Sequence, residues 1–198
     1  MPGGNSLALL PAARHDFGRN MSPPDRRFER IGGRTVYEGR IISVHVDRFR
    51  YADGEEEERE IVRHQGAVGV LPYDDEHVYL VRQPREAVDD PDVLEIPAGR
   101  KDKDGEEPLA TAKRELAEEI GKGADAWEHI TDYWSSVGVM DEVVHVYAAT
   151  GLHDAHADSG ETERIETVAW PLSDLDGAIS ATHDAKTLIA LLWLKTRL

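Results

Sequence analysis

The sequence predicts an α+β fold, an α/β/α sandwich in which a mixed β-sheet is packed between helices and follows an N-terminal antiparallel β-hairpin region. Three observations support this prediction. Residues 35–63 alternate apolar with polar side chains around an acidic, glycine-containing turn. Several short apolar runs follow. Helical spacing of apolar residues occurs only at residues 107–121 and from about residue 185 to 198, so the order of elements is strands, one helix, more strands and a closing helix.

One domain accounts for most of the chain. The length of 198 residues falls within the ~100–200 residues of common single domains. Residues 1–25 are rich in proline and glycine without apolar periodicity, so we expect a disordered leader, and residues 26–198 are expected to form the domain. An apolar stretch at residues 7–13 is too short, and lacks the preceding positive segment, for a secretion signal.

The strands expected after the hairpin are short apolar runs bounded by turn residues. The first two are separated only by the turn-forming "DDE" at residues 74–76, so we expect them to be adjacent core strands. An acidic loop at residues 153–163 separates the last two. The expected strands lie at residues 66–73, 77–83, 93–99, 142–152 and 164–172.

Acidic side chains dominate the charge of the protein. Thirty-nine Asp and Glu residues against 23 Lys and Arg give a formal net charge of −16. Such a surface repels nucleic acid and anionic lipid, and no apolar run reaches the ~20 residues that cross a bilayer, so we expect neither kind of partner. The chain has no cysteine, which excludes disulfides and thiolate chemistry and fits a cytoplasmic location.

Glutamates crowd into the loop and helix around residues 106–119. On a helix, Glu115 and Glu119 form an i,i+4 pair of like charge, which costs a few tenths of a kcal/mol. Glu118 lies beside them, and the three carboxylates are suitable ligands for a hard divalent cation such as Mg²⁺. Glutamate-rich helix faces also occur as plain solvated surface, so both interpretations stay open on the glutamates alone.

The residues around these glutamates decide between the two interpretations. Gly99 and Gly105 bracket a loop before the helix, and Gly121 ends the helix. With them the sequence resembles the Nudix hydrolase family, whose signature is G-x5-E-x7-R-E-U-x-E-E-x-G-U with U apolar. The matching positions are Glu106, Arg114, Glu115, Leu116, Glu118, Glu119 and Gly121.

Two departures from the signature leave its carboxylates intact. Six residues instead of five separate Gly99 from Glu106, and Lys122 replaces the last apolar residue. The resemblance covers residues 38–197, and "VRQPRE", "VLEIPAGR" and "GVMDEVVHVYAATGL" are similar to the ADP-ribose pyrophosphatase branch of the family.

The resemblance implies a Nudix fold and a metal site. It makes Glu115 and Glu119 the main ligands of two or three Mg²⁺ ions, with Mn²⁺ as a possible substitute. Glu118, Glu163 and the Ala98 carbonyl complete the site. Arg114 is expected to orient the glutamates.

The resemblance offers two candidates for the catalytic base, Glu161 in the acidic loop and Glu142 at the start of a strand. A plain acidic loop and a strand-edge charge are the respective alternatives. Arg85 matches an arginine that binds substrate phosphate, for which a surface salt bridge is the alternative.

The resemblance also bears on assembly and on the substrate. Residues 35–63 correspond to strands through which that branch forms homodimers, so Arg59 is expected either to serve the neighbouring subunit's site or to be an exposed hairpin arginine. Gly138 is expected to be a substrate-binding residue, and Val137 precedes it where the branch usually has a proline. This departure favours another nucleotide sugar or a dinucleotide as the alternative substrate.

The function implied is hydrolysis of a nucleoside diphosphate linked to another group, above all ADP-ribose to AMP and ribose 5-phosphate. One alternative is the same chemistry on another nucleotide sugar or a dinucleoside polyphosphate. A non-catalytic nucleotide sensor is an alternative of another class, although such a protein would be expected to have lost signature carboxylates that this chain retains.

Overall fold

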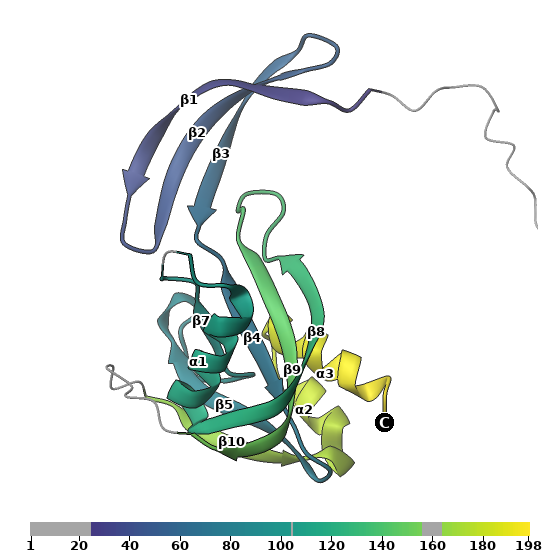
Figure 1. Ribbon diagram of the computed structural model, residues 1–198. Coiled ribbons are helices and arrows are strands. Elements are labelled where there is room, and N and C mark those ends of the chain that lie inside the picture. The colour runs from purple at the N-terminus through teal and green to yellow at the C-terminus, as the bar shows by residue number, and fades with distance from the viewer. Residues whose placement is uncertain (1–24, 104, 156–163) are drawn as a thin grey trace, which may run out of the picture.

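The computed structural model describes residues 25–103, 105–155 and 164–198. The described part of the chain has the predicted α+β class, with a body of sheets and helices and an antiparallel sheet preceding it (Figure 1). None of its helices is long and apolar enough to cross a membrane.

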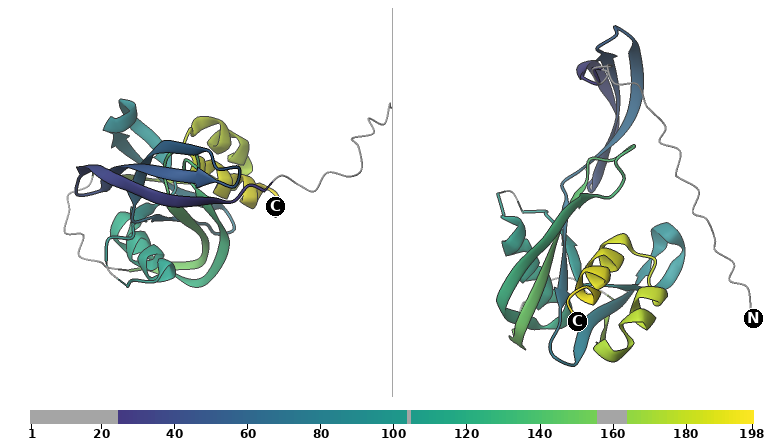
Figure 2. Two further views of the ribbon diagram at one scale, coloured as in Figure 1. Left: turned by 90° about the horizontal axis from the view of Figure 1, so that it is seen from above. Right: turned by 90° about the vertical axis from the view of Figure 1, so that its right-hand side faces the viewer.

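The N-terminal arm, residues 28–64, is a three-stranded antiparallel sheet in the order β1-β2-β3. Its strands are β1 (Phe28–Glu38), β2 (Ile42–Tyr51) and β3 (Glu56–His64). The pattern at residues 35–51 suggested one strand, but a turn at residues 39–41 divides it, with the Gly39 amide donating to the Ile42 carbonyl. The arm extends away from one end of the body (Figures 1 and 2).

The body contains a mixed four-stranded sheet in the order β7-β4-β9-β8, with β4 and β9 parallel. A three-stranded antiparallel sheet, β10-β5-β6, lies beside it. The runs expected to be adjacent core strands, β4 and β5, are joined by one bridge between Tyr73 and Val78 but enter different sheets. The strands are β4 (Ala67–Pro72), β5 (His77–Arg85), β6 (Asp90–Glu95), β7 (Ala98–Arg100), β8 (Lys122–Trp134), β9 (Val143–Asp154) and β10 (Glu166–Pro171).

Helices cover both faces of the mixed sheet, which confirms the sandwich. Helix α1 (Pro108–Ile120) buries Ala112 and Leu116 against Val68, Val70 and Ala149. Helices α2 (Leu175–Ala181) and α3 (Ala185–Lys195) form the other core with side chains of β4, β5, β6 and β9. Short 3₁₀ turns at Glu86–Val88 and Leu172–Asp174 complete the elements.

The alternation along β4 gives each face of the sheet its own partners. Val68 and Val70 point toward α1, and Leu71 belongs to the core of α2 and α3. Both helical layers therefore pack against the same buried strand, β4.

Candidate active site

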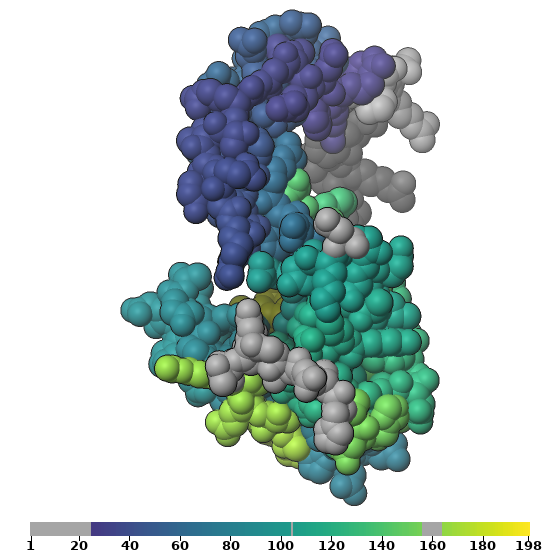
Figure 3. Space-filling model, turned by 60° about the vertical axis from the view of Figure 1, so that its left-hand side comes forward, coloured from purple at the N-terminus to yellow at the C-terminus, as the bar shows by residue number. Residues whose placement is uncertain are grey.

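A cleft of about 770 Å³ opens between α1 and β7 on one side and the ends of β5 and α3 on the other. Ile41, at the tip of the arm, also lines it, and Figure 3 shows the hollow below that tip. Charged side chains make up much of the lining: Arg85, Arg100, Asp102, Lys103, Arg114, Glu115, Glu118, Glu119, Glu142, Asp184 and Lys186.

Helix α1 presents the three signature carboxylates to this cleft. Pro108 occupies its first turn, and Gly121, at φ 66°, ends it by donating its amide to the carbonyls of Leu116 and Ala117, which confirms the predicted cap. The buried stripe of α1 faces the sheet. Glu115, Glu118 and Glu119 lie beside that stripe and line the cleft.

Arg114 lies among four carboxylates. Its guanidinium is 2.6 Å from Glu115 and 2.8 Å from Glu118, and it lies 3.3 Å from both Glu106 and Asp102. The guanidinium therefore ties together signature carboxylates from the loop and from the helix. It is consistent with the orienting role expected for Arg114.

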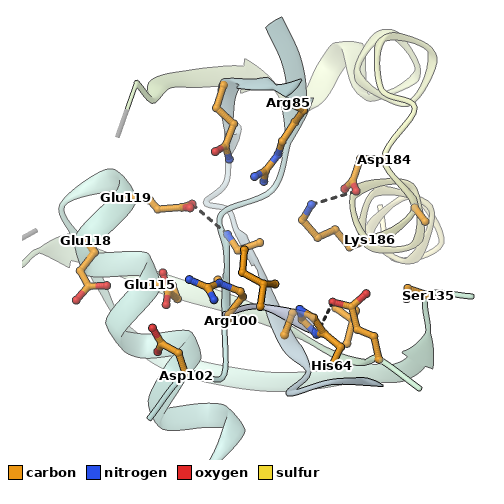
Figure 4. Close-up of a pocket in the computed structure, with 18 of the residues that line it drawn as sticks. His64, Arg85, Arg100, Asp102, Glu115, Glu118, Glu119, Ser135, Asp184 and Lys186 are labelled. Atoms are coloured by element: carbon orange, nitrogen blue, oxygen red, sulfur yellow. Dashed lines mark hydrogen bonds and ion pairs between the residues drawn. The ribbon is translucent and has the colours of Figure 1, made fainter. Parts of the chain in front are cut away.

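Gly99 makes room for Glu115. A β-carbon at this glycine would lie 2.0 Å from the carboxyl carbon of Glu115, far inside van der Waals contact. The residue before Gly99 holds Glu119 in place, because the amide of Ala98 donates to the Oε2 of Glu119 at 3.0 Å (Figure 4). The short strand β7 therefore fixes the carboxylates of both residues expected to be the main metal ligands.

Burial of Glu115 raises the pKa of its carboxyl group from the ordinary 4.5 to about 7, against the lowering effect of Arg114. Glu118 adds to the rise by like-charge repulsion. No three acidic or histidine side chains in the described residues already converge as a metal cage. Burial makes ionisation of the Glu115 carboxyl group unfavourable unless a cation is bound nearby. Together with the two neighbouring carboxylates, it is a set of oxygen ligands that fits a hard divalent cation.

The opposite wall carries two cations that share one buried carboxylate. The Nε and one terminal nitrogen of Arg85 donate to Glu95 at 2.5 Å and 2.8 Å, and Lys186 ion-pairs with the same carboxylate. The Glu95 side chain is only 2% exposed. Burial would raise its pKa, but pairing with Arg85 and Lys186 holds the pKa below the ordinary value.

Glu142 lies in the same cleft, next to the arm. Its Oε1 is 3.1 Å from Nδ1 of His64, the last residue of β3. The preceding residue, Asp141, accepts from the His64 amide at 2.9 Å and pairs with Arg63 at 3.0 Å. The position of this candidate base is therefore tied to the arm.

Arg59 and Gly138 lie together in a different place. Both line a second hollow of about 290 Å³ between the arm and the loop before β9, along with Phe28 and Val137. Arg59 donates to Glu57 at 2.9 Å and to the Tyr51 hydroxyl at 3.2 Å. Glu161 and Glu163 lie outside the described residues.

The structure places Glu95, His64, Asp184 and Lys186 in the candidate site, and sequence reasoning had missed all four. Glu95 offered a signal, since it is a lone acid within the apolar run "VLEIP". Lys186 offered none, because a lysine near the start of a helix is common on protein surfaces.

Comparisons with known proteins identify relatives of this chain in sequence and in fold. The NUDIX domain model matches residues 63–192. A methanol dehydrogenase activator from Bacillus methanolicus is 34% identical over 165 residues, which cover 81% of this chain and 88% of that protein. An ADP-ribose pyrophosphatase from Bacillus subtilis is 36% identical over 172 residues, which cover 84% of this chain and 92% of that protein. The crystal structure of an ADP compounds hydrolase has a similar fold, with a TM-score of 0.79 and 22% identity over 89% of this chain and 97% of that one.

Proposed function

The chain belongs to the Nudix family of hydrolases, and from that premise we propose that it is a Mg²⁺-dependent pyrophosphohydrolase that cleaves ADP-ribose to AMP and ribose 5-phosphate. The observation that carries the proposal is a cleft with the α1 carboxylates on one wall and Arg85 with Lys186 on the other. A diphosphate could bind between these walls, with its oxygens near metal ions held by the carboxylates on one side and near the fixed cationic side chains on the other. The choice of ADP-ribose is supported by the name of the Bacillus subtilis relative.

Glu115, Glu118 and Glu119, with the Ala98 carbonyl, would hold the metal. Bound Mg²⁺ would neutralise the diphosphate and lower the pKa of the attacking water. Arg85 would donate to phosphate oxygens with the N–H groups that Glu95 does not use. For the base, Glu142 beside His64 competes with Glu161; Glu163 would serve as a further ligand.

A substrate panel tests the assignment. With Mg²⁺ present, we expect ADP-ribose to have the highest kcat/KM among ADP-ribose, other nucleotide sugars and dinucleoside polyphosphates. Val137 stands where the branch usually has proline, and this favours another nucleotide sugar as the second candidate. An ADP-ribose value about tenfold below a competitor, equal to about 1.4 kcal/mol in transition-state binding, would select that candidate.

Metal binding should depend on pH through Glu115. Its pKa of about 7 in the folded protein exceeds the ordinary 4.5. Ionising Glu115 therefore lowers the stability of the metal-free protein as the pH rises from 4.5 to about 7. A cation needs the ionised form. At pH 6 only about a tenth of Glu115 is ionised, so Mg²⁺ should bind about tenfold more weakly than at pH 8.

The measurement is the rise in melting temperature on adding Mg²⁺ at the two pH values. We expect the larger rise at pH 8, and Glu115→Gln should remove the difference. An equal or larger rise at pH 6 would mean that Glu115 does not hold the cation.

We also propose that the arm mediates a homodimer. Several of its apolar side chains are exposed, with Phe28 at 65% and Tyr37 at 56%, and Val137 beside the arm is 81% exposed. Apolar surface of this kind marks an interface. The second copy would cover it and bring Arg59 near the partner's cleft. We place the enzyme in the cytoplasm on its cysteine-free composition alone.

Deleting residues 1–63 should abolish both dimerisation and activity, because it removes the arm and the strand that holds the Asp141–Glu142 loop. Deleting residues 1–20 should change neither. Phe28→Glu should give a monomer, whereas Leu192→Glu, at a 51% exposed site on α3, should leave the dimer intact. Sedimentation reports the outcome, and an active monomer lacking residues 1–63 would refute this role of the arm.

A further inference from the structure

The cleft wall opposite α1 contains more hydrogen-bond donors than the one arginine that the sequence indicated. Gln83 and Arg85 come from β5, and Lys186 comes from the first turn of α3. We propose that Lys186 and Gln83, together with Arg85, form a subsite that binds the phosphate oxygens of the diphosphate. This inference rests on the proposed function and names the residues that would recognise its substrate.

Lys186 is held rigidly at its place. The hydroxyl of Thr187 accepts from the amide of Ile96 at 2.8 Å and donates to Asp184 at 2.6 Å. The hydroxyl of Thr182 donates to the carbonyl of Leu94 at 2.7 Å. These bonds fasten the start of α3 to the end of β6, so the backbone that carries Lys186 cannot swing out of the cleft.

The lysine side chain packs beside Gly69 in β4. A β-carbon at Gly69 would lie 3.7 Å from the Cδ of Lys186 and only 2.9 Å from Ile96. The aliphatic stem therefore passes close to the β4 backbone, and the side chain is only 12% exposed. Its ammonium group reaches Glu95 and lies 3.0 Å from Asp184. Figure 4 shows Lys186 and Arg85 across the cleft from Glu119.

The Glu95 carboxylate lies deeper in the protein than the charged group of Arg85. Glu95 is 2% exposed, whereas Arg85 is 41% exposed and turns part of its guanidinium to the cleft. An ammonium has three donors and a guanidinium five, and the bonds to Glu95 and Asp184 use only some of them. The remaining donors of two fixed cations can bind an anion that enters between them and α1.

Gln83 supplies an independent indication of a ligand. Its Nε2 is buried and has no hydrogen-bond partner among the described residues, although the side chain lines the cleft. A buried amide donor without an acceptor is unfavourable until a ligand provides one. Phosphate oxygens accept hydrogen bonds and do not donate them when ionised, which matches a wall of donors from an amide, an ammonium and a guanidinium.

A purely structural role, in which Lys186 only neutralises Glu95, makes a different prediction. Lys186→Met removes the charge at similar length but leaves Glu95 with one partner. The double variant Glu95→Gln with Lys186→Met removes both charges and leaves the net charge unchanged. If Lys186 only balances the charge of Glu95, the double variant should regain the pyrophosphate affinity that the single variant loses.

The probe is inorganic pyrophosphate, titrated by calorimetry into the full-length protein with Mg²⁺, with melting curves for each variant. We expect Lys186→Met and the double variant to bind it at least about tenfold more weakly, and Lys186→Arg to retain most of the affinity. Gln83→Leu should weaken it about threefold or more. Lys195→Met, on the same helix and paired with exposed Asp176, should stay within about twofold of wild type.

A folded double variant that binds pyrophosphate as tightly as wild type would overturn the inference. If the wild-type protein still hydrolyses ADP-ribose in that case, the proposed function stands and Lys186 only balances Glu95. A wild-type protein that neither binds pyrophosphate nor hydrolyses any diphosphate would overturn both.

Discussion

Glu119→Gln is expected to lower kcat by a factor of about 10² or more while the protein stays folded. Glutamine keeps the size of the side chain, and its oxygen can still accept from the Ala98 amide, which lies 3.0 Å from Glu119. Only the negative charge is lost. A divalent cation binds a carboxylate far better than an amide, so the loss should fall on metal-dependent turnover.

The matched control for this variant is Glu107→Gln. Glu107 is exposed, lies at the start of the same helix and makes no side-chain capping bond. Its kcat should stay within about twofold of wild type, as for most surface changes. Turnover in Glu119→Gln equal to wild type would mean that the metal ligand has been misplaced.

Gly99→Ala should reduce kcat about as strongly, although it touches no charge. The new methyl carbon would lie 2.0 Å from the carboxyl carbon of Glu115, so that side chain must leave its position. Displacing a metal ligand by an ångström or more is expected to cost about 10²-fold in rate. The overpacking itself should lower stability by about 1–3 kcal/mol.

Gly105→Ala is the control that distinguishes displacement of Glu115 from a general disturbance of the signature loop. Gly105 has φ +76°, which alanine adopts with strain, but its β-carbon would meet nothing within 4 Å. It should therefore lose stability but keep turnover. If both variants lose turnover equally, or if Gly99→Ala stays fully active, the fit between Gly99 and Glu115 does not matter for catalysis.

The features that could be predicted from sequence are those encoded locally. Helix α1 shows a clean period of apolar residues, a proline at its start and a glycine at its end, so its bounds and the adjacency of Glu115, Glu118 and Glu119 follow from spacing alone. Strands that form apolar runs, such as β4 and β9, could also be predicted because their signal is local.

The elements that sequence reasoning missed have broken or weak patterns. Strand β8 carries a bulge between His129 and Thr131. Trp127 before it packs in the core of α1, whereas Ile130 and Tyr133 pack in the core of α2 and α3, so no regular alternation shows in the sequence. In β1 the register shifts near Gly32 hide the alternation of the first arm strand. Helix α2 has only seven residues, too few for a period to show.

The partners of Arg85 on the second wall of the site could not be predicted, for another reason. Glu95 and Lys186 are 91 positions apart in the chain, and the bonds that fix Lys186 run from α3 to the end of β6. No local spacing encodes such a pair. Only the packing of α3 across the sheet brings Lys186 to the carboxylate that Arg85 also binds, so the carboxylate wall and Arg85 could be predicted, and Glu95 and Lys186 could not.

The most direct test of the central claim is an analysis of the products formed from ADP-ribose by the purified full-length protein with Mg²⁺ and with excess chelator. We expect AMP and ribose 5-phosphate in equal amounts when Mg²⁺ is present, and no cleavage when the metal is removed. Cleavage that persists in chelator, or no cleavage of ADP-ribose or any other nucleoside diphosphate derivative with Mg²⁺, would contradict the account.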